Sequence, residues 1–123
     1  MLNNKIVIAD DEPHILLSLK YVVGKMGGFQ VFPAENGEEA LKLIQTELPR
    51  MVILDVMMPK MSGFEVCDKI KKDTALKDTY VILLTAKGQE TDKEKGYAMG
   101  ADEYFTKPFD PDKLLNKIKS VMQ

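Results

Sequence analysis

Short apolar runs alternate with longer amphipathic segments along the whole chain. Three of the runs carry apolar, largely β-branched residues at consecutive positions, which is typical of strands covered on both faces of a parallel sheet. Another run contains a proline and therefore suits an edge strand. The predicted strands are residues 5–9, 29–34, 51–54, 80–84 and 103–105.

Apolar residues at helical spacing lie between these runs. The first stripe predicts one helix that begins at Pro13 and ends at Gly27–Gly28. The second helix carries Leu48 on its apolar stripe and is closed by Pro49, and the third is expected to open at Ser62 as its N-cap. The predicted helices lie around residues 13–26, 40–48, 62–70, 89–99 and 110–122.

The fourth helical segment differs from the others, because its sequence QETDKEKGYAM has apolar residues only at its end and contains Gly96. Thin packing is expected, which would make this helix the most easily shifted element. A solvated surface helix and a mobile functional face are both compatible with this pattern.

The alternation of strands and helices predicts an α/β fold, with five βα units forming a parallel sheet covered by helices on both faces. The chain has 123 residues, with 45% apolar and 29% charged residues, which is an ordinary globular composition for one domain over residues 1–123. In such sheets, ligands bind at the carboxyl ends of the strands.

Charge and composition exclude several function classes. The net charge is −2, so the domain has no basic footprint for nucleic acid and is not attracted to anionic membranes. One Cys and one His cannot build a zinc site of those ligands or a disulfide, and no GxSxG motif accompanies His14. The first residues resemble neither a signal peptide nor a membrane span, which favours a reducing cytoplasm.

Chemistry-bearing side chains follow four of the predicted strands: Asp10 and Asp11, Asp55, Thr85, and Lys107. The carboxyl ends of parallel strands meet at one edge, so these groups are expected to share a cleft. Clustered carboxylates repel one another and call for a hard cation, Mg²⁺ or Mn²⁺. The Thr and Lys suit phosphate oxygens, and an ionised carboxylate can act as a nucleophile that forms an acyl phosphate.

Each of these residues also has a plainer interpretation. Asp10 or Asp11 could cap the first helix, Asp55 could form an Asx turn, Thr85 could simply end a strand, and Lys107 could lie in an ordinary turn. Taken singly, most of these interpretations are as good as a functional one. The coincidence of four strand ends favours a Mg²⁺–phosphate site.

The segments IVIADDEP, VILDVMMPKMSGFEV, VILLTA and ADEYFTKPF resemble the receiver domain of bacterial two-component response regulators, in order and spacing along essentially the whole chain. The resemblance implies a flavodoxin-like, doubly wound three-layer fold with strand order 2-1-3-4-5. It implies that Asp55 is the phosphoacceptor and that Asp10, Asp11, Asp55 and the Met57 carbonyl bind Mg²⁺ or Mn²⁺. Thr85 would hydrogen-bond one phosphoryl oxygen, and Lys107 would pair with another.

The resemblance also implies a switch. Thr85 would move toward the phosphoryl group and Tyr104 would turn inward, altering the face formed by the fourth helix, fifth strand and fifth helix. The Lys107–Pro108 peptide bond is expected to be cis. Met57 and Lys87 would influence the rate of dephosphorylation.

The implied partners are a sensor histidine kinase or phosphotransfer protein, and an output domain or effector protein reached through that face or through a homodimer. The domain would act as a signalling switch and not as an enzyme, apart from its own phosphorylation and slow dephosphorylation. The alternative is a pseudo-receiver that binds proteins without phosphorylation. A dehalogenase-like phosphatase is disfavoured, because it needs a second Asp two residues after its nucleophile and Met57 stands there. A flavodoxin is disfavoured because no hydroxyl-rich phosphate loop follows the first predicted strand, and a dinucleotide-binding enzyme because the sequence has no GxGxxG motif.

Overall fold

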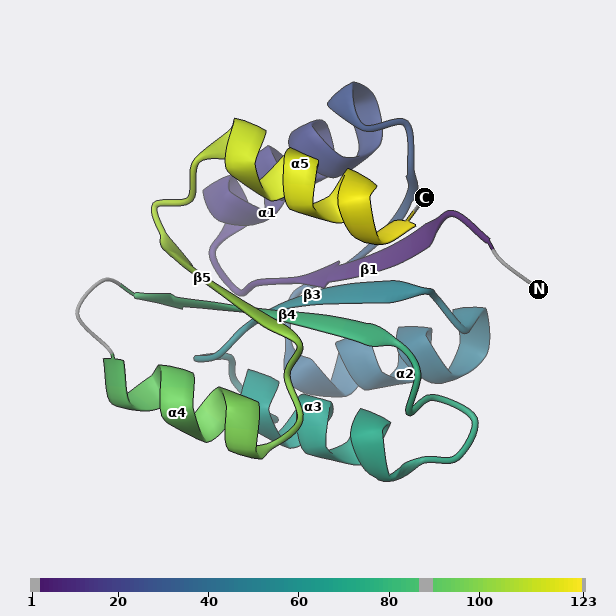
Figure 1. The fold of residues 1–123 in the computed structure, drawn as a ribbon, viewed down its shortest axis with the longest axis vertical. Helices are drawn as coiled ribbons and strands as arrows, with labels where there is room; N and C mark the ends of the chain where they lie inside the picture. The colour runs from purple at the N-terminus through teal and green to yellow at the C-terminus, as the bar shows by residue number, and fades with distance from the viewer. Residues whose placement is uncertain (1–2, 87–89, 123) are drawn as a thin grey trace.

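The computed structural model describes residues 3–86 and 90–122. Strands and helices alternate along the chain, as the hydrophobic pattern predicts (Figure 1). The elements in order are β1 (Lys5–Ala9), α1 (Pro13–Lys20), η1 (Tyr21–Met26), β2 (Gln30–Ala34), α2 (Gly37–Glu47), β3 (Met51–Asp55), α3 (Gly63–Lys72), β4 (Tyr80–Ala86), α4 (Glu90–Ala98), β5 (Glu103–Lys107) and α5 (Pro111–Met122).

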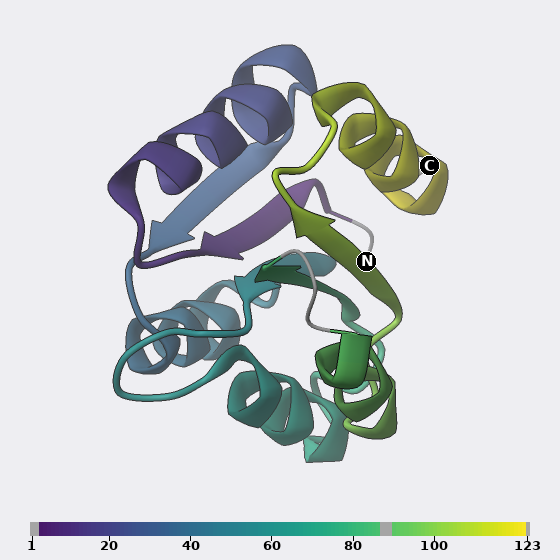
Figure 2. The same cartoon turned by 90° about the vertical axis from the view of Figure 1, so that its left-hand side faces the viewer.

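The five strands form one parallel sheet in the order β2-β1-β3-β4-β5. Helices α1 and α5 cover one face, and α2, α3 and α4 cover the other (Figures 1 and 2). This is the doubly wound, flavodoxin-like three-layer arrangement that was expected. β2 is an edge strand, which agrees with its exposed proline at position 33, because an edge tolerates a missing N–H donor.

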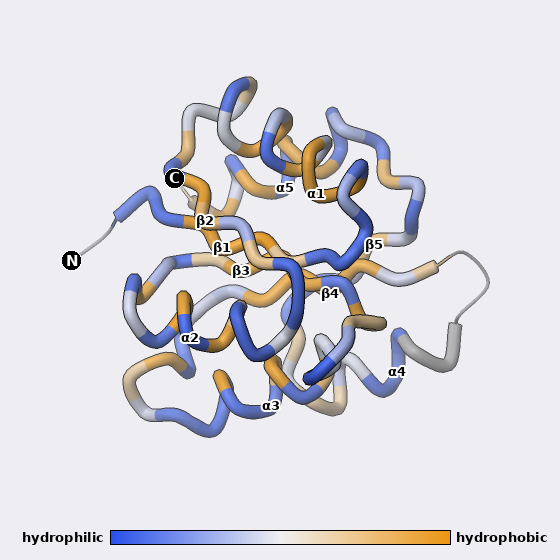
Figure 3. Tube along the Cα trace, turned by 180° about the vertical axis from the view of Figure 1, so that it is seen from behind, coloured by the Kyte–Doolittle hydropathy of each residue, from blue (hydrophilic) through white to orange (hydrophobic). Residues whose placement is uncertain are grey.

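Two apolar cores lie on opposite faces of the sheet. Alternate residues of each central strand point to opposite sides, so Val7 joins the core beneath α2, α3 and α4, whereas Ile6 and Ile8 join the core beneath α1 and α5. The central strands are therefore the most apolar part of the chain, as the colours of Figure 3 show. Because these strands are buried on both faces, their residues are apolar at consecutive positions of the sequence.

Helices α2 and α3 begin with side-chain caps, of which the Ser62 cap was predicted. The Ser62 side chain accepts a hydrogen bond from the Glu65 backbone N–H, and the Glu65 side chain accepts one from the Ser62 backbone, which completes a capping box at the start of α3. Asn36 caps α2 in a similar way. The predicted N-cap of the third helix is therefore confirmed.

Two helical expectations need correction. The predicted helix over residues 13–26 is α-helical only to Lys20, and η1 continues it as a π-helix. Gly24 lies inside that segment and lacks the side chain that favours regular α-helical winding. Leu48 does not lie on a buried stripe: it is exposed and adopts a left-handed conformation just after α2, because the chain turns there before Pro49.

Helix α4 is packed as thinly as its sequence indicates. Between residues 93 and 98, where the structure describes its side chains, Gly96 is the buried residue. A Cβ atom at this position would lie 2.8 Å from Cδ1 of Leu83 and 3.2 Å from Cε2 of Tyr104, so the glycine permits a close approach to β4 and β5. The predicted start of this helix at Gln89 falls outside the described residues.

No helix within the described parts of the chain is long and apolar enough to cross a membrane.

Candidate functional site

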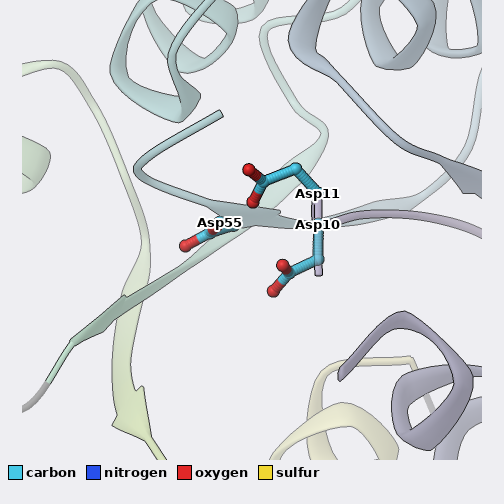
Figure 4. A group of neighbouring side chains, drawn as sticks. All are labelled: Asp10, Asp11 and Asp55. Atoms are coloured by element: carbon cyan, nitrogen blue, oxygen red, sulfur yellow. The ribbon is translucent and has the colours of Figure 1, made fainter. Parts of the chain in front are cut away.

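Three carboxylates meet at the carboxyl ends of β1 and β3 (Figure 4). The two strands are adjacent and Ala9 pairs with Leu54, so the residues that follow them, Asp10 and Asp55, emerge side by side. One carboxylate oxygen from each of these residues and from Asp11 lies within 4.8 Å of the others. Asp10 is fully buried and Asp55 is 4% exposed, whereas Asp11 is exposed to solvent.

The end of β5 places a cation among these acids. Nζ of Lys107 lies 2.9 Å from Oδ2 of Asp10 and 3.3 Å from Oδ1 of Asp55. It also lies 3.3 Å from Oε1 of Glu12, a residue that sequence reasoning did not select as part of the site. Glu12 could have been found from its position directly after the acidic pair. The Lys107–Pro108 peptide bond is cis.

The electrostatic balance at Asp55 favours its neutral form. Burial, followed by the charge of Asp10, raises the pKa of the Asp55 carboxyl to about 7, although Lys107 opposes this shift. For Lys107, burial disfavours the ammonium, but its hydrogen bond to Asp10 and the charges of Asp55 and Asp10 raise its pKa above the ordinary value. Among the described residues, the Lys107 ammonium is thus shared by the carboxylates of Asp10, Asp55 and Glu12.

The local backbone positions the acids without using them as helix caps. Oδ1 of Asp10 accepts a hydrogen bond from the backbone N–H of Glu12, and the N-cap of α1 is Glu12 itself, without a side-chain cap. The interpretation of Asp10 or Asp11 as a cap for α1 is therefore wrong. After Asp55, the backbone N–H of Gly63 donates to the carbonyl of Val56, and a Cβ atom at residue 63 would overlap the Asp55 backbone.

Asp11 and Asp55 border a pocket of about 500 Å³ that opens at this edge of the sheet, and Asp10 is not among the described residues that line it. The side chain of Met57 is 75% exposed beside it. The predicted site residues Asp11, Asp55, Met57 and Lys107 contribute to its wall. The lining residues are Asp11, Glu12, Ile15, Asp55, Met57, Ala86, Lys107 and Pro108.

Comparison with known proteins decides the family. Residues 6–119 match the family model of the response regulator receiver domain. The chain belongs to this family. The transcriptional regulatory protein PhoP for alkaline phosphatase synthesis in Bacillus subtilis is 40% identical over 122 residues, which are 99% of this chain and 50% of that protein.

Other receivers resemble the chain to a similar degree. The phosphate regulon transcriptional regulatory protein PhoB of Pseudomonas aeruginosa is 37% identical, with 100% of this chain and 53% of that protein covered. The chain thus spans about half the length of these curated relatives. The chemotaxis response regulator CheY4 of Vibrio cholerae has a TM-score of 0.87 and 30% identity, with 98% of this chain and 99% of that one covered.

The remaining predicted site residues of this receiver, Thr85 and Tyr104, lie on β4 and β5. Thr85 is buried near the end of β4, one residue beyond Leu84, which pairs with Asp55. It is not among the described residues that line the pocket. Tyr104 is partly buried on β5 against the core under α4, and its ring lies 6.3 Å from that of Tyr97.

Two other residues that the structure describes, His14 and Cys67, do not line this pocket. His14 is exposed on α1, and Cys67 is a buried free cysteine whose Sγ lies 3.6 Å from the Met99 carbonyl oxygen. Burial raises the pKa of the Cys67 thiol to about 11, so it is an unreactive core residue. Lys87, expected to influence dephosphorylation, lies outside the described residues.

The donor set at this site fits a hard divalent cation. One oxygen from each of three carboxylates lies within 4.8 Å of the others, and burial, with the charge of Asp10 as the second cause, raises the pKa of Asp55. Carboxylate and carbonyl oxygens without sulfur or imidazole ligands favour Mg²⁺ or Mn²⁺ over zinc.

Proposed function

We propose that this domain is a phosphorylation-dependent switch in which Asp55 accepts a phosphoryl group from a phosphohistidine of a sensor histidine kinase or phosphotransfer protein. The observation that carries the proposal is the juxtaposition of the Asp55 carboxylate, two further carboxylates and the Lys107 ammonium, with Asp55 and Lys107 lining an open pocket. Phosphoryl transfer depends on positioning and charge neutralisation more than on covalent machinery, and these groups supply both.

In the proposed reaction, a carboxylate oxygen of Asp55 attacks the phosphorus atom, the phosphorus–nitrogen bond breaks, and the histidine nitrogen keeps the electron pair. The product is an acyl phosphate. Asp10, Asp11, Asp55 and the Met57 carbonyl would hold Mg²⁺ or Mn²⁺, which supplies positive charge that favours the ionised nucleophile and the phosphoryl oxygens. Lys107 already lies 3.3 Å from Oδ1 of Asp55 and would pair with a phosphoryl oxygen.

The proposed signal passes from Asp55 to the surface around α4. The Thr85 hydroxyl would hydrogen-bond a phosphoryl oxygen, and Tyr104 would turn inward into the space released. The thin packing of α4 supports this proposal. Gly96 is the one buried residue between positions 93 and 98, and a helix with so few buried contacts can move with a small loss of free energy. The altered α4-β5-α5 face would then control an output domain or effector, directly or through a homodimer.

The names of the relatives extend the proposal to the whole protein. PhoP and PhoB are transcriptional regulatory proteins, and this chain covers about half of each. We infer that the domain serves a cytoplasmic regulator of transcription, with DNA contacts made by another part of that regulator, since the domain itself has a net charge of −2.

The test uses a small phosphodonor with Mg²⁺ and intact-protein mass spectrometry. The wild type and the remote control Asp78→Asn should each gain one phosphoryl group, whereas Asp55→Asn should gain none. A label that survives Asp55→Asn would remove Asp55 from its role.

Amide chemical shifts provide a second test. Beryllofluoride with Mg²⁺ should shift the amides of Thr85 and Tyr104 in the wild type and leave them unchanged in Asp55→Asn. If neither phosphodonor nor beryllofluoride changes the wild type, the domain is a phosphorylation-independent pseudo-receiver.

A further inference from the structure

Met57 has the most exposed large apolar side chain among the described residues, with an exposed fraction of 75%. A single exposed apolar side chain is ordinary on a protein surface. This one differs because it carries a reactive atom. The thioether sulfur of methionine takes up an oxygen atom from peroxides, and the product, a sulfoxide, is polar.

The other described methionines give the oxidant less access to their sulfur atoms. Five of them are buried or pack against the core: Met51, Met58, Met61, Met99 and Met122. Met26 is 44% exposed, but it lies on η1 and does not line the acidic pocket. Oxygen transfer requires contact between the oxidant and the sulfur, so Met57 is expected to react first.

The position of Met57 connects this reactive group with the acidic pocket. Met57 lines the pocket of about 500 Å³ together with Asp55 and Lys107. It follows Asp55 by two residues, on the loop after β3. Hydrogen peroxide is small and uncharged, so the carboxylates do not repel it. An oxidant that enters the pocket therefore meets a thioether side chain beside the proposed phosphoacceptor.

We propose that Met57 is a reversible oxidation site through which a peroxide shortens the lifetime of the acyl phosphate on Asp55. The sulfur lone pair attacks one oxygen of hydrogen peroxide and the oxygen–oxygen bond breaks. The departing hydroxide takes the proton of the sulfur-bound hydroxyl and becomes water. The sulfur is oxidised by two electrons and the peroxide is reduced by two. Methionine sulfoxide reductases return the thioether.

Oxidation changes how this wall of the pocket interacts with water. A thioether is a weak hydrogen-bond acceptor, whereas a sulfoxide oxygen is a strong one. Water can approach Asp55 through the pocket that Met57 also lines. A sulfoxide at this position accepts a hydrogen bond from that water and holds it near the phosphorus atom. The backbone carbonyl of Met57 is not altered, so the proposed cation ligand is retained.

The oxidation is independent of phosphorylation, whereas its effect on the acyl phosphate rests on the proposed function. Peptide mapping by mass spectrometry tests the oxidation alone, with limiting hydrogen peroxide and a chelator that suppresses metal-derived radicals. In the folded chain, Met57 should gain oxygen before the other described methionines. In the urea-unfolded chain, Met57 and Met51 should react at equal rates. Equal rates in the folded chain would overturn the proposal.

Decay of the phosphorylated chain tests the consequence. The wild type, with or without prior oxidation, is phosphorylated by a small phosphodonor with Mg²⁺, freed from the donor and followed by intact-protein mass spectrometry. Oxidation should accelerate loss of the phosphoryl group about 3-fold or more, but less than the ~100-fold of a positioned general base, because a sulfoxide orients water without taking up its proton. A methionine sulfoxide reductase should restore the slower decay.

Three variants assign the effect to one sulfur atom. Met57→Leu lacks the sulfur and should lose the response to peroxide, whatever its own rate of decay. Met26→Leu removes the other exposed methionine of the described chain and, as the matched control, should keep the response. Met57→Gln places a polar acceptor at the same position and should decay faster than Met57→Leu without peroxide. Circular dichroism confirms that each variant is folded.

Two kinetic results would overturn the effect on lifetime: an unchanged decay after oxidation of Met57, or a response to peroxide that persists in Met57→Leu. A chain that takes up no phosphoryl group before oxidation would instead contradict the proposed function of Asp55 and, with it, the effect on lifetime. The order of oxidation still decides the oxidation site in that case, so the two failures are distinguishable.

Discussion

The acidic pocket and helix α4 both adjoin β4 and β5, but their packing is very different. At the pocket, Asp10 and Asp55 are almost completely buried at the ends of β1 and β3, in which residues 6–9 and 51–54 are fully buried. On α4, the described side chains include one buried residue, Gly96, and the helix leaves Tyr97 42% exposed. The chemistry thus lies on the rigid part of the domain, and the proposed signal lies on the loosely held part.

This difference is physically useful for a switch. Repelling carboxylates can be held together only by surroundings that do not yield, and the central strands of a doubly covered sheet are such surroundings. A helix that reports on the site must instead have two arrangements of similar free energy, which requires few buried contacts.

The largest expected effect comes from removing charge in the rigid part. Asp55→Asn should raise the free energy of unfolding at neutral pH in metal-free buffer by about 3 kcal/mol, because the carboxyl has a pKa of about 7 in the folded chain and 3.8 as its ordinary value. A raised folded pKa means that the folded chain holds its proton more tightly. The penalty of Asp55 is therefore absent below pH 3.8 and grows until about pH 7.

Urea denaturation with chelator across this pH range measures the effect, with Asp78→Asn as the remote control. The advantage of Asp55→Asn should increase with pH and shrink when Mg²⁺ is added. A constant difference across the pH range would show that repulsion and burial at Asp55 are not its cause.

The second effect concerns the cation of the same region. Lys107→Met should lower the free energy of unfolding by about 2–3 kcal/mol in metal-free buffer at neutral pH, because removing one partner of a buried ion pair leaves uncompensated charge. Its ammonium pairs with Asp10, Asp55 and Glu12. Denaturation with and without Mg²⁺ should show that Mg²⁺ stabilises this variant more than the wild type. Lys42→Met, an exposed control on α2, should show neither effect.

On the loosely held side, Gly96→Ala should lower the free energy of unfolding by about 1 kcal/mol, as the cost of overpacking exceeds the better helix propensity of alanine. The added Cβ atom would meet Leu83 at 2.8 Å, so α4 should move outward. Thermal denaturation and the amide shift of Tyr104 report the two consequences. Ala98→Gly, at an exposed position of the same helix, measures the propensity contribution alone. If Gly96→Ala instead raised the free energy of unfolding, α4 would be able to move outward without a loss of stability.

The smallest effect concerns the contact between α4 and α3. Nζ of Lys95 lies 4.7 Å from the centroid of the Phe64 ring. Lys95→Gln should lower the free energy of unfolding by about 0.5 kcal/mol, which is the size of an exposed cation–π interaction. A double-mutant cycle with Phe64→Leu isolates the pair. A coupling energy near zero would mean that this contact does not help to hold α4.

Much of the fold could be predicted from local patterns. The five apolar runs, the proline in the edge strand, the Ser62 cap and the weak apolar face of α4 are all visible in the sequence. The winding of η1 and the exposure of Leu48 were not predicted, because both depend on how a helix end meets its neighbours. Periodicity describes an average helix and does not register a change of winding over one or two turns.

The candidate site divides in the same way. The residue types and their positions after strands predicted a gathering of Asp10, Asp11, Asp55 and Lys107 at one edge, since parallel strands end together. Which partner each group has, including the contact between Lys107 and Glu12, depends on strand order and side-chain conformation. These are set by contacts between distant segments.

By itself, the sequence determined the order of strands and helices, the family of the domain and the residues available for chemistry, because these depend on local composition and spacing. Only the tertiary structure decided which acids are buried and how strongly Lys107 offsets them. It also showed that the Met57 side chain stands exposed at the wall of the acidic pocket. Burial, charge balance and surface shape arise when remote parts of the chain come together, and the pattern along the chain contains no measure of them.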